Sequence, residues 1–74
     1  MKNKSEYILS VRIIQLLDKN NMSQVEFANR IKVHPNTVAR WLNKPAFPAV
    51  NNLIEISKLF EISIDWLLGL TDER

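Results

Sequence analysis

A three-residue connection between two short helical segments constrains the fold more than any other feature of this sequence. Apolar residues recur at helical spacing over residues 24–31 and again over residues 35–43. Only Lys32, Val33 and His34 separate the two segments. A link this short cannot join long antiparallel helices, so the pair must cross steeply, as in a helix-turn-helix unit. The second helix is then free to stand on the surface of the domain.

The ends of both helices carry capping residues. Ser23 suits the N-cap of the first helix, and Glu26 three residues later completes a capping box. Pro35 suits the first position of the second helix, where its missing N–H costs nothing. The segment Asn43-Lys44-Pro45 then ends this helix.

Three further helices are predicted around this pair. They cover residues 6–20, residues 50–60 and a short stretch that Ser63 caps and that runs through Leu68. Ser5 is the N-cap candidate of the first, and Asn20-Asn21 ends it in a left-handed conformation. Strand signals are poor, and a single glycine leaves hairpin turns without their usual residue. The sequence therefore predicts one all-α, five-helix domain over residues 1–74, with residues 1–4 and 71–74 flexible.

Composition argues against several classes of function. The chain has no cysteine and only one histidine, His34, so it offers no metal-ligand set. A nucleophile–base pair and a phosphate-cradling glycine loop are also missing, so we expect neither an enzyme nor a cofactor. No apolar run is long enough to span a bilayer or to serve as a signal peptide, and we expect a cytoplasmic protein.

Charge is distributed unevenly along the chain. Residues 1–45 carry eight Lys and Arg against three Asp and Glu, whereas residues 46–74 carry two against five. A basic N-terminal part followed by an acidic C-terminal part indicates that a polyanionic partner binds one side of the molecule. An ordinary mixed surface would give the same count, and charge alone does not separate the two interpretations.

The outer face of residues 35–43 is where function would lie. Val38, Trp41 and Leu42 fall on the inner face. Asn36 and Arg40 fall one turn apart on the outer face, where asparagine could pair with adenine and arginine with guanine. The same residues are ordinary on the wet side of a surface helix, and composition alone favours that plainer interpretation.

A resemblance changes this balance. The segment MSQVEFANRIKVHPNTVARWLN, followed by PAVNNLIEISKLFEISIDWLLG, resembles the lambda-repressor-like (Cro/repressor-type) helix-turn-helix family. The resemblance implies a sequence-specific, double-stranded-DNA-binding transcriptional regulator that acts as a repressor. It also implies that the helix over residues 35–43 enters the major groove of a palindromic operator. A protein-interaction module that keeps the fold, such as an anti-repressor or an antitoxin-like domain, is the alternative.

Site residues follow from the same resemblance, position by position. The positions that read bases in the family are Pro35, Asn36 and Arg40. The positions that contact DNA phosphates are Gln24, Lys32, Thr37, Asn43 and Lys44, and Arg12 is a possible flanking contact or a plain surface charge. The family commonly forms homodimers, which implies apolar interface positions at Ile62, Ile64, Trp66 and Leu70.

Three departures from the family pattern are informative. Lys32 replaces a turn glycine, which costs about 1 kcal/mol if the position keeps a positive φ. His34 replaces a Ser or Thr cap, and as a lone histidine it fits a weak cap or a backbone neighbour better than a catalytic or pH-sensing residue. Leu17 and Leu42 replace an ion pair of the family, so we expect these two side chains to be in contact.

Overall fold

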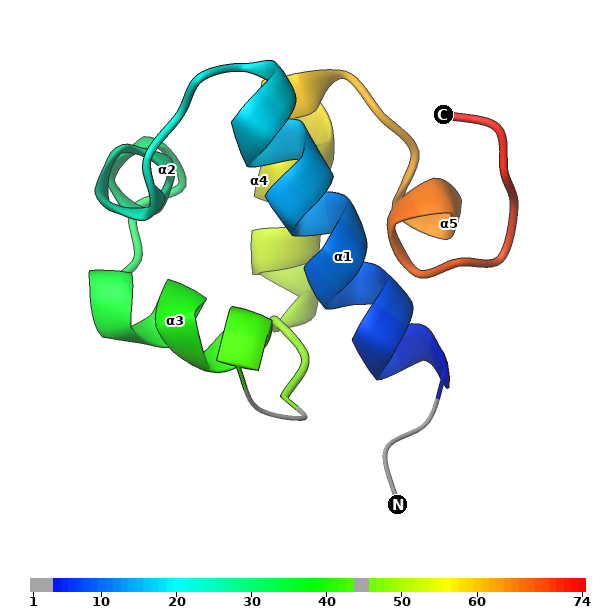
Figure 1. Ribbon diagram of the computed structural model, residues 1–74, viewed down its shortest axis with the longest axis horizontal. Coiled ribbons are helices and arrows are strands. Elements are labelled where there is room, and N and C mark those ends of the chain that lie inside the picture. The colour runs from blue at the N-terminus through cyan, green and yellow to red at the C-terminus, as the bar shows by residue number, and fades with distance from the viewer. Residues whose placement is uncertain (1–3, 44–45) are drawn as a thin grey trace.

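Five helices make up the protein in a computed structural model that describes residues 4–43 and 46–74. They are α1 (Lys4–Lys19), α2 (Gln24–Arg30), α3 (Pro35–Asn43), α4 (Val50–Phe60) and α5 (Ile64–Leu67) (Figure 1). The described residues contain no strand, which confirms the all-α prediction. Nor does any helix in these two ranges combine the length and apolar character needed to cross a membrane.

The helix boundaries agree closely with the sequence patterns. α3 and α4 begin and end at the predicted residues, while α2 and α5 each end one residue early, at Arg30 and Leu67. α1 is the exception, because it already begins at Lys4. Ser5 therefore lies inside the first turn of α1 and is not its N-cap.

α1 runs through the middle of the fold and separates two parts of it. Figure 1 shows α2 and α3 on one side of α1, α5 and the C-terminus on the other, and α4 behind. α2 is seen nearly end-on while α3 runs across the view, so the two helices cross steeply as predicted. Apolar side chains from all five helices meet in one core, and the largest that are fully buried are Phe27, Leu9, Ile13, Ile56, Leu67 and Val38.

The pair that replaces an ion pair of the family lies in this core. Leu17 is buried, and Leu42 is half-buried and packs against the same cluster. α1 and α3, which carry them, lie against each other. Direct contact between the two side chains stays a prediction.

Left-handed residues close four of the helices. Asn21 at φ 50° follows α1, Lys32 at φ 62° follows α2, Glu61 at φ 55° follows α4, and Gly69 at φ 80° follows α5. The N–H after each left-handed residue returns to a carbonyl of the last turn; the Met22 N–H, for example, donates to the Leu17 carbonyl at 2.9 Å. The single glycine also permits close packing, because a Cβ at Gly69 would lie 2.7 Å from Ile8 Cδ1. The predicted left-handed ending of α1 is confirmed at Asn21.

Arg12 ties the C-terminal segment to α1. Its guanidinium donates to the backbone carbonyls of Trp66 and, at 3.0 Å, of Thr71. It also lies 3.2 Å from Asp72 Oδ1 and stacks on the Trp66 ring. The Ser63 N–H donates to the Arg74 carbonyl at 3.0 Å. These contacts join residues 71–74 to α1 and to the start of α5, and the flexibility expected for this segment stays a prediction.

We expect Arg12→Ala to lower the free energy of unfolding by about 2 kcal/mol, because hydrogen bonds to a charged group contribute roughly 1.5–3 kcal/mol. Urea denaturation measures this difference. Arg30→Ala is the matched control, since it removes an exposed i,i+4 pair with Glu26 and should cost no more than about 0.5 kcal/mol. Equal losses in the two variants would contradict a structural role for Arg12.

Candidate nucleic-acid interface

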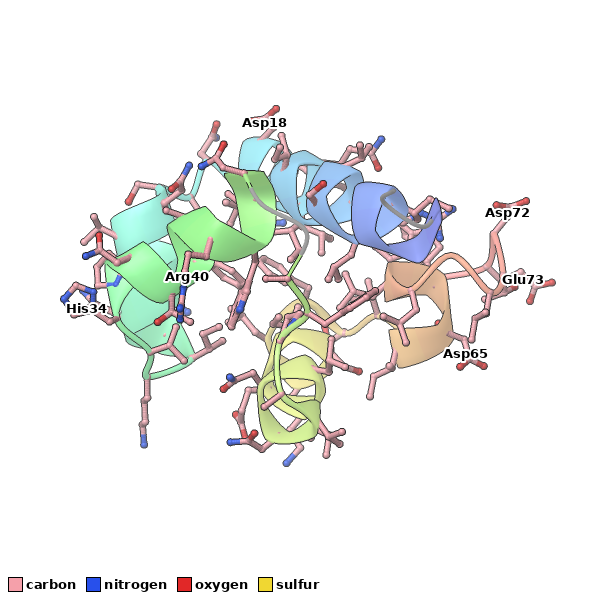
Figure 2. All side chains as sticks on the ribbon, turned by 90° about the horizontal axis from the view of Figure 1, so that it is seen from below. Asp18, His34, Arg40, Asp65, Asp72 and Glu73 are labelled. Atoms are coloured by element: carbon pink, nitrogen blue, oxygen red, sulfur yellow. The ribbon has the colours of Figure 1, made fainter. Side chains whose placement is uncertain are left out.

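The two faces of α3 have different environments. Val38 and Trp41 are buried in the core, and this burial fixes how the helix is rotated. Asn36, Arg40 and Asn43 are exposed. Figure 2 looks onto α3 and shows Arg40 on its outer side. The predicted base-reading pair, Asn36 and Arg40, is thus brought onto one exposed face, one helical turn apart.

Half-buried residues complete this face. Pro35, Thr37 and Ala39 are each half-buried, and none of them carries a long side chain. A major groove admits a helix only where no bulky side chain stands between the backbone and the base edges. The start of α3 meets this requirement.

His34 caps the start of α3. Its Nδ1 atom accepts a hydrogen bond from the Asn36 backbone N–H at 3.0 Å. Its carbonyl accepts the Thr37 N–H at 2.9 Å, and Pro35 between them has no N–H to satisfy. The predicted role of His34 as a cap is confirmed. Because Nδ1 is the acceptor, the proton of the neutral ring lies on Nε2, an assignment that follows from the hydrogen bond.

Lys32 forms the turn that leads into α3. The Lys32 N–H donates to the Asn29 carbonyl at 3.3 Å, and the Val33 N–H donates to the Ala28 carbonyl at 2.9 Å. This pair of bonds is the Schellman motif, in which a left-handed residue ends a helix. Lys32 has φ 62°, so the strain expected for a lysine at this position is present. Its side chain is exposed.

The start of α2 is capped as predicted, in part. Ser23 Oγ accepts the Glu26 N–H at 3.0 Å. The Glu26 carboxylate lies 3.4 Å from the Arg30 guanidinium, and among the described residues it makes no return bond to Ser23. Gln24, the predicted phosphate contact, is the first residue of α2 and is exposed. The free N–H groups of a helix start lie beside it.

Of the two phosphate contacts predicted at the end of α3, the structure describes one, Asn43. Asn43 Nδ2 donates to the Ala39 carbonyl of its own helix at 2.9 Å, and the side chain is exposed. Lys44, the other predicted phosphate contact here, lies outside the described residues.

Several exposed charges of opposite sign lie at opposite ends of the described molecule. The separation is incomplete, because Arg12 and Arg74 lie at the acidic end and Glu26 pairs with Arg30. Arg30, Lys32 and Arg40 are exposed cations on α2, the turn and α3. Three acidic residues lie at the other end, around α5 and the C-terminus: Asp65, Asp72 and Glu73 (Figure 2). The helix that presents Arg40 therefore lies away from the acidic end, as a polyanionic partner requires.

Two predictions about the remaining site residues need correction. Ile62 and Trp66 are only 7% and 4% exposed, because they belong to the core of the protomer itself. The guanidinium groups of Arg12 and Arg74 each lie 4.7 Å from the centre of the Trp66 ring. Neither residue offers apolar surface to a second chain. Arg12 is likewise engaged inside the protomer by its contacts with Trp66, Thr71 and Asp72.

Two other predicted interface residues retain some exposure. Ile64 is half-buried against the core, and Leu70 is 70% exposed. Sequence reasoning missed Val50, which is 71% exposed, and the exposed Phe47 and Ile54 near it in the sequence. Val50 and Ile54 lie one turn apart at the start of α4, and Phe47 precedes the helix; the 3- and 4-residue spacing of these apolar residues is the pattern that could have revealed them.

Sequence reasoning also missed a groove beside the turn. The groove has a volume of about 280 Å³ and lies between the end of α2 and the start of α4. Its lining residues are Arg30, Ile31, Lys32, Asn51, Asn52 and Glu55. Two consecutive asparagines at a helix start were the only sequence signal for it.

Comparison with known proteins agrees with this geometry. The helix-turn-helix family model matches residues 13–67. The HTH-type transcriptional regulator YobD of Bacillus subtilis (strain 168) is 24% identical over 62 residues, which are 84% of this chain and 55% of that protein. The chain thus spans about half the length of this curated relative.

A solved structure has the same fold. The solution structure of the SOS-response transcriptional repressor LexA from Eubacterium rectale matches with a TM-score of 0.84 and 26% sequence identity. The match covers 92% of this chain and 72% of that one. With the family model covering well over half of the sequence, the chain belongs to the Cro/C1-type helix-turn-helix family of DNA-binding transcription regulators.

Proposed function

We propose that the protein is a sequence-specific repressor that binds a palindromic operator with α3 in the major groove. The observation that carries this proposal is the shared exposed face of Asn36 and Arg40, opposite the buried Val38 and Trp41. A helix that enters the major groove presents its N-terminal residues to base edges, and Asn36 is the second residue of α3.

Three residues read the bases in this proposal. Asn36 pairs with adenine and Arg40 with guanine, each through two hydrogen bonds. Pro35 lies beside Asn36 and allows the helix backbone to approach a thymine methyl group. Arg40 forms no ion pair with the other described residues, so its guanidinium need not break one before it binds a base.

Five residues hold the phosphate backbone. Gln24 acts together with the free N–H groups at the start of α2. Lys32 contributes a cation from the turn, and the remaining three contacts are Thr37, Asn43 and Lys44. These contacts set the position of α3 along the DNA and give affinity without sequence preference.

A homodimer on DNA completes the proposal. Leu70 supplies its apolar contact, and the half-buried Ile64 and the exposed Val50 are further contributors. Two-fold pairing places two copies of α3 about 34 Å apart, one turn of the double helix, and so requires a palindrome. A regulator of this kind acts where the DNA is, and we propose the cytoplasm of its cell.

Selection of bound duplexes from a random pool tests the proposed readout. We expect the wild-type protein to select a palindrome, and Arg40→Ala to relax the preference at one base position per half-site, at a cost of about 1–3 kcal/mol. Arg74→Ala removes an arginine near the acidic end and is the matched control, which should keep the full preference. If Arg40→Ala selects the wild-type sequence unchanged, Arg40 is not a reader.

The salt dependence of DNA affinity distinguishes the proposed repressor from a protein-interaction module that keeps the fold. A DNA-binding protein loses affinity steeply as salt rises, because bound phosphates release counterions. Failure to bind any duplex at low salt would instead favour the protein-interaction module.

Lys32→Gly tests the role of the turn. We expect it to raise the free energy of unfolding by about 1 kcal/mol, because glycine adopts φ 62° without strain. It should also weaken DNA binding and reduce by about one the slope of log affinity against log salt concentration, because one phosphate contact is lost. Glu61→Gly relieves the same strain at φ 55° after α4 and should stabilise the protein without weakening binding. Equal affinities in the two variants would remove Lys32 from the phosphate contacts.

Leu70→Glu tests the dimer. We expect it to weaken binding to a two-half-site duplex at least tenfold while leaving single-half-site binding unchanged, because it adds a charge to an apolar contact. Val11→Glu places the same charge on α1 at a side chain that is 50% exposed, and serves as the control. Gel-shift titration measures both. If Leu70→Glu binds the two-half-site duplex as tightly as the wild-type protein does, Leu70 is not part of the interface.

A further inference from the structure

We propose that His34 makes the sequence specificity of DNA binding depend on whether its imidazole ring is protonated. The inference rests on the proposed function, because it concerns how α3 is held while Asn36 reads a base. It assigns to His34 a positioning role, since the residue acts through the first turn of α3. The sequence alone did not favour a pH-sensing role for this histidine, because the bond to the Asn36 N–H is visible only in the structure.

The hydrogen bond to Asn36 carries the argument. Asn36 is both the candidate base reader nearest the helix start and the residue whose N–H His34 Nδ1 accepts, at 3.0 Å. An imidazole nitrogen accepts a hydrogen bond only while it carries no proton. The cap therefore exists only in the neutral ring. When the ring becomes charged, a proton occupies Nδ1, the atom that accepts the Asn36 N–H in the cap.

Protonation has two effects at this position. It removes the acceptor, which leaves the Asn36 N–H without its cap and loosens the first turn. It also places a positive charge at the positive end of the α3 dipole, which opposes helix formation there. Both effects disturb the placement of Asn36. They lower the affinity for the operator, where Asn36 must lie at a base edge. They do not lower the affinity for unrelated DNA, which phosphate contacts alone hold.

The added charge affects all DNA sequences alike. His34 is exposed at the start of α3, and an imidazolium there attracts phosphate whatever the base sequence. Binding to an unrelated duplex is thus unchanged or strengthened, while binding to the operator loses its advantage. Acidification therefore lowers the ratio of operator affinity to unrelated-duplex affinity. This holds whether the absolute affinity for the operator rises through the added charge or falls through the lost cap.

The surroundings of His34 do not supply a substitute for the cap. The charged residues on the elements around it are Asp18, Lys19, Glu26, Arg30, Lys32 and Arg40. Among the described residues no carboxylate forms an ion pair with His34; that of Glu26 lies 3.4 Å from Arg30. Asp18 lies along α1, away from His34 (Figure 2). Within the part of the chain that the structure describes, no ion pair would hold an imidazolium where the neutral ring lies.

Composition makes the inference easy to test. His34 is the single histidine of the chain. Histidine is the side chain whose charge ordinarily changes between about pH 8 and pH 5.5. His34→Ser replaces the ring with a good cap that does not titrate, and it leaves every other ionisable group in place.

The experiment measures the affinity of the selected duplex and of a scrambled duplex at about pH 8 and about pH 5.5, at constant ionic strength. We expect the affinity ratio of the wild-type protein to fall roughly threefold or more on acidification, the size of a lost cap. In His34→Ser the ratio should be the same at both pH values. A wild-type ratio that does not fall, or an equal fall in His34→Ser, would overturn the inference.

A measurement without DNA keeps the inference separate from the proposed function. In NMR spectra, we expect the Asn36 amide resonance to shift with the protonation of the His34 ring, and not to shift over this range in His34→Ser. An Asn36 amide that does not follow the ring would refute the cap. Lack of any sequence preference at about pH 8 would refute the proposed function, even where the amide follows the ring.

Discussion

The burial of Val38 and Trp41 is the constraint on which the rest of the account depends. These two side chains fill the core beside α1, and once they are inside, the opposite side of α3 must face solvent. The turn at Lys32 fixes the other degree of freedom, because its left-handed residue sets the direction in which the chain leaves α2. Rotation and direction together determine where Asn36 and Arg40 lie. The exposed face of α3 is therefore a consequence of core packing.

Two residues at the entrance to α3 are poor choices for local stability. A glycine would adopt the conformation of Lys32 without strain, and a serine would cap more strongly than His34. Both positions instead carry exposed side chains that can donate to phosphate oxygens. Departures from local rules cluster at functional sites in natural proteins. Their position supports the view that this corner of the molecule serves binding at some cost in stability.

The sequence predicts the helices well and the long-range contacts poorly. The bounds of α3 follow from Pro35 at its start and Asn43 at its end, both of which are local signals. The cap at His34 is equally local. The role of Arg12 is not, because its carbonyl partners lie 54 and 59 residues further along the chain. Spacing patterns carry no information about such a contact.

The interface residues show a second limit. α5 has only four residues, too few for periodicity to distinguish an inward from an outward face. Trp66 therefore could have been core or surface, and the structure places it in the core. The left-handed Glu61 after α4 gave no signal either, since glutamate is unusual in that conformation. Asn36 and Arg40 are exposed and Lys32 is left-handed, as the sequence analysis expected, while the contacts of these residues with DNA stay predictions.

Amide NMR locates the surface of the protein that meets DNA. Titration of the isotope-labelled protein with its selected duplex, followed by amide NMR, maps the surface that meets DNA. We expect the largest shifts on residues 32–43 and on the start of α2 at Gln24, with little change around α5. Shifts concentrated on α5 and the C-terminal segment, with α3 unaffected, would contradict this expectation.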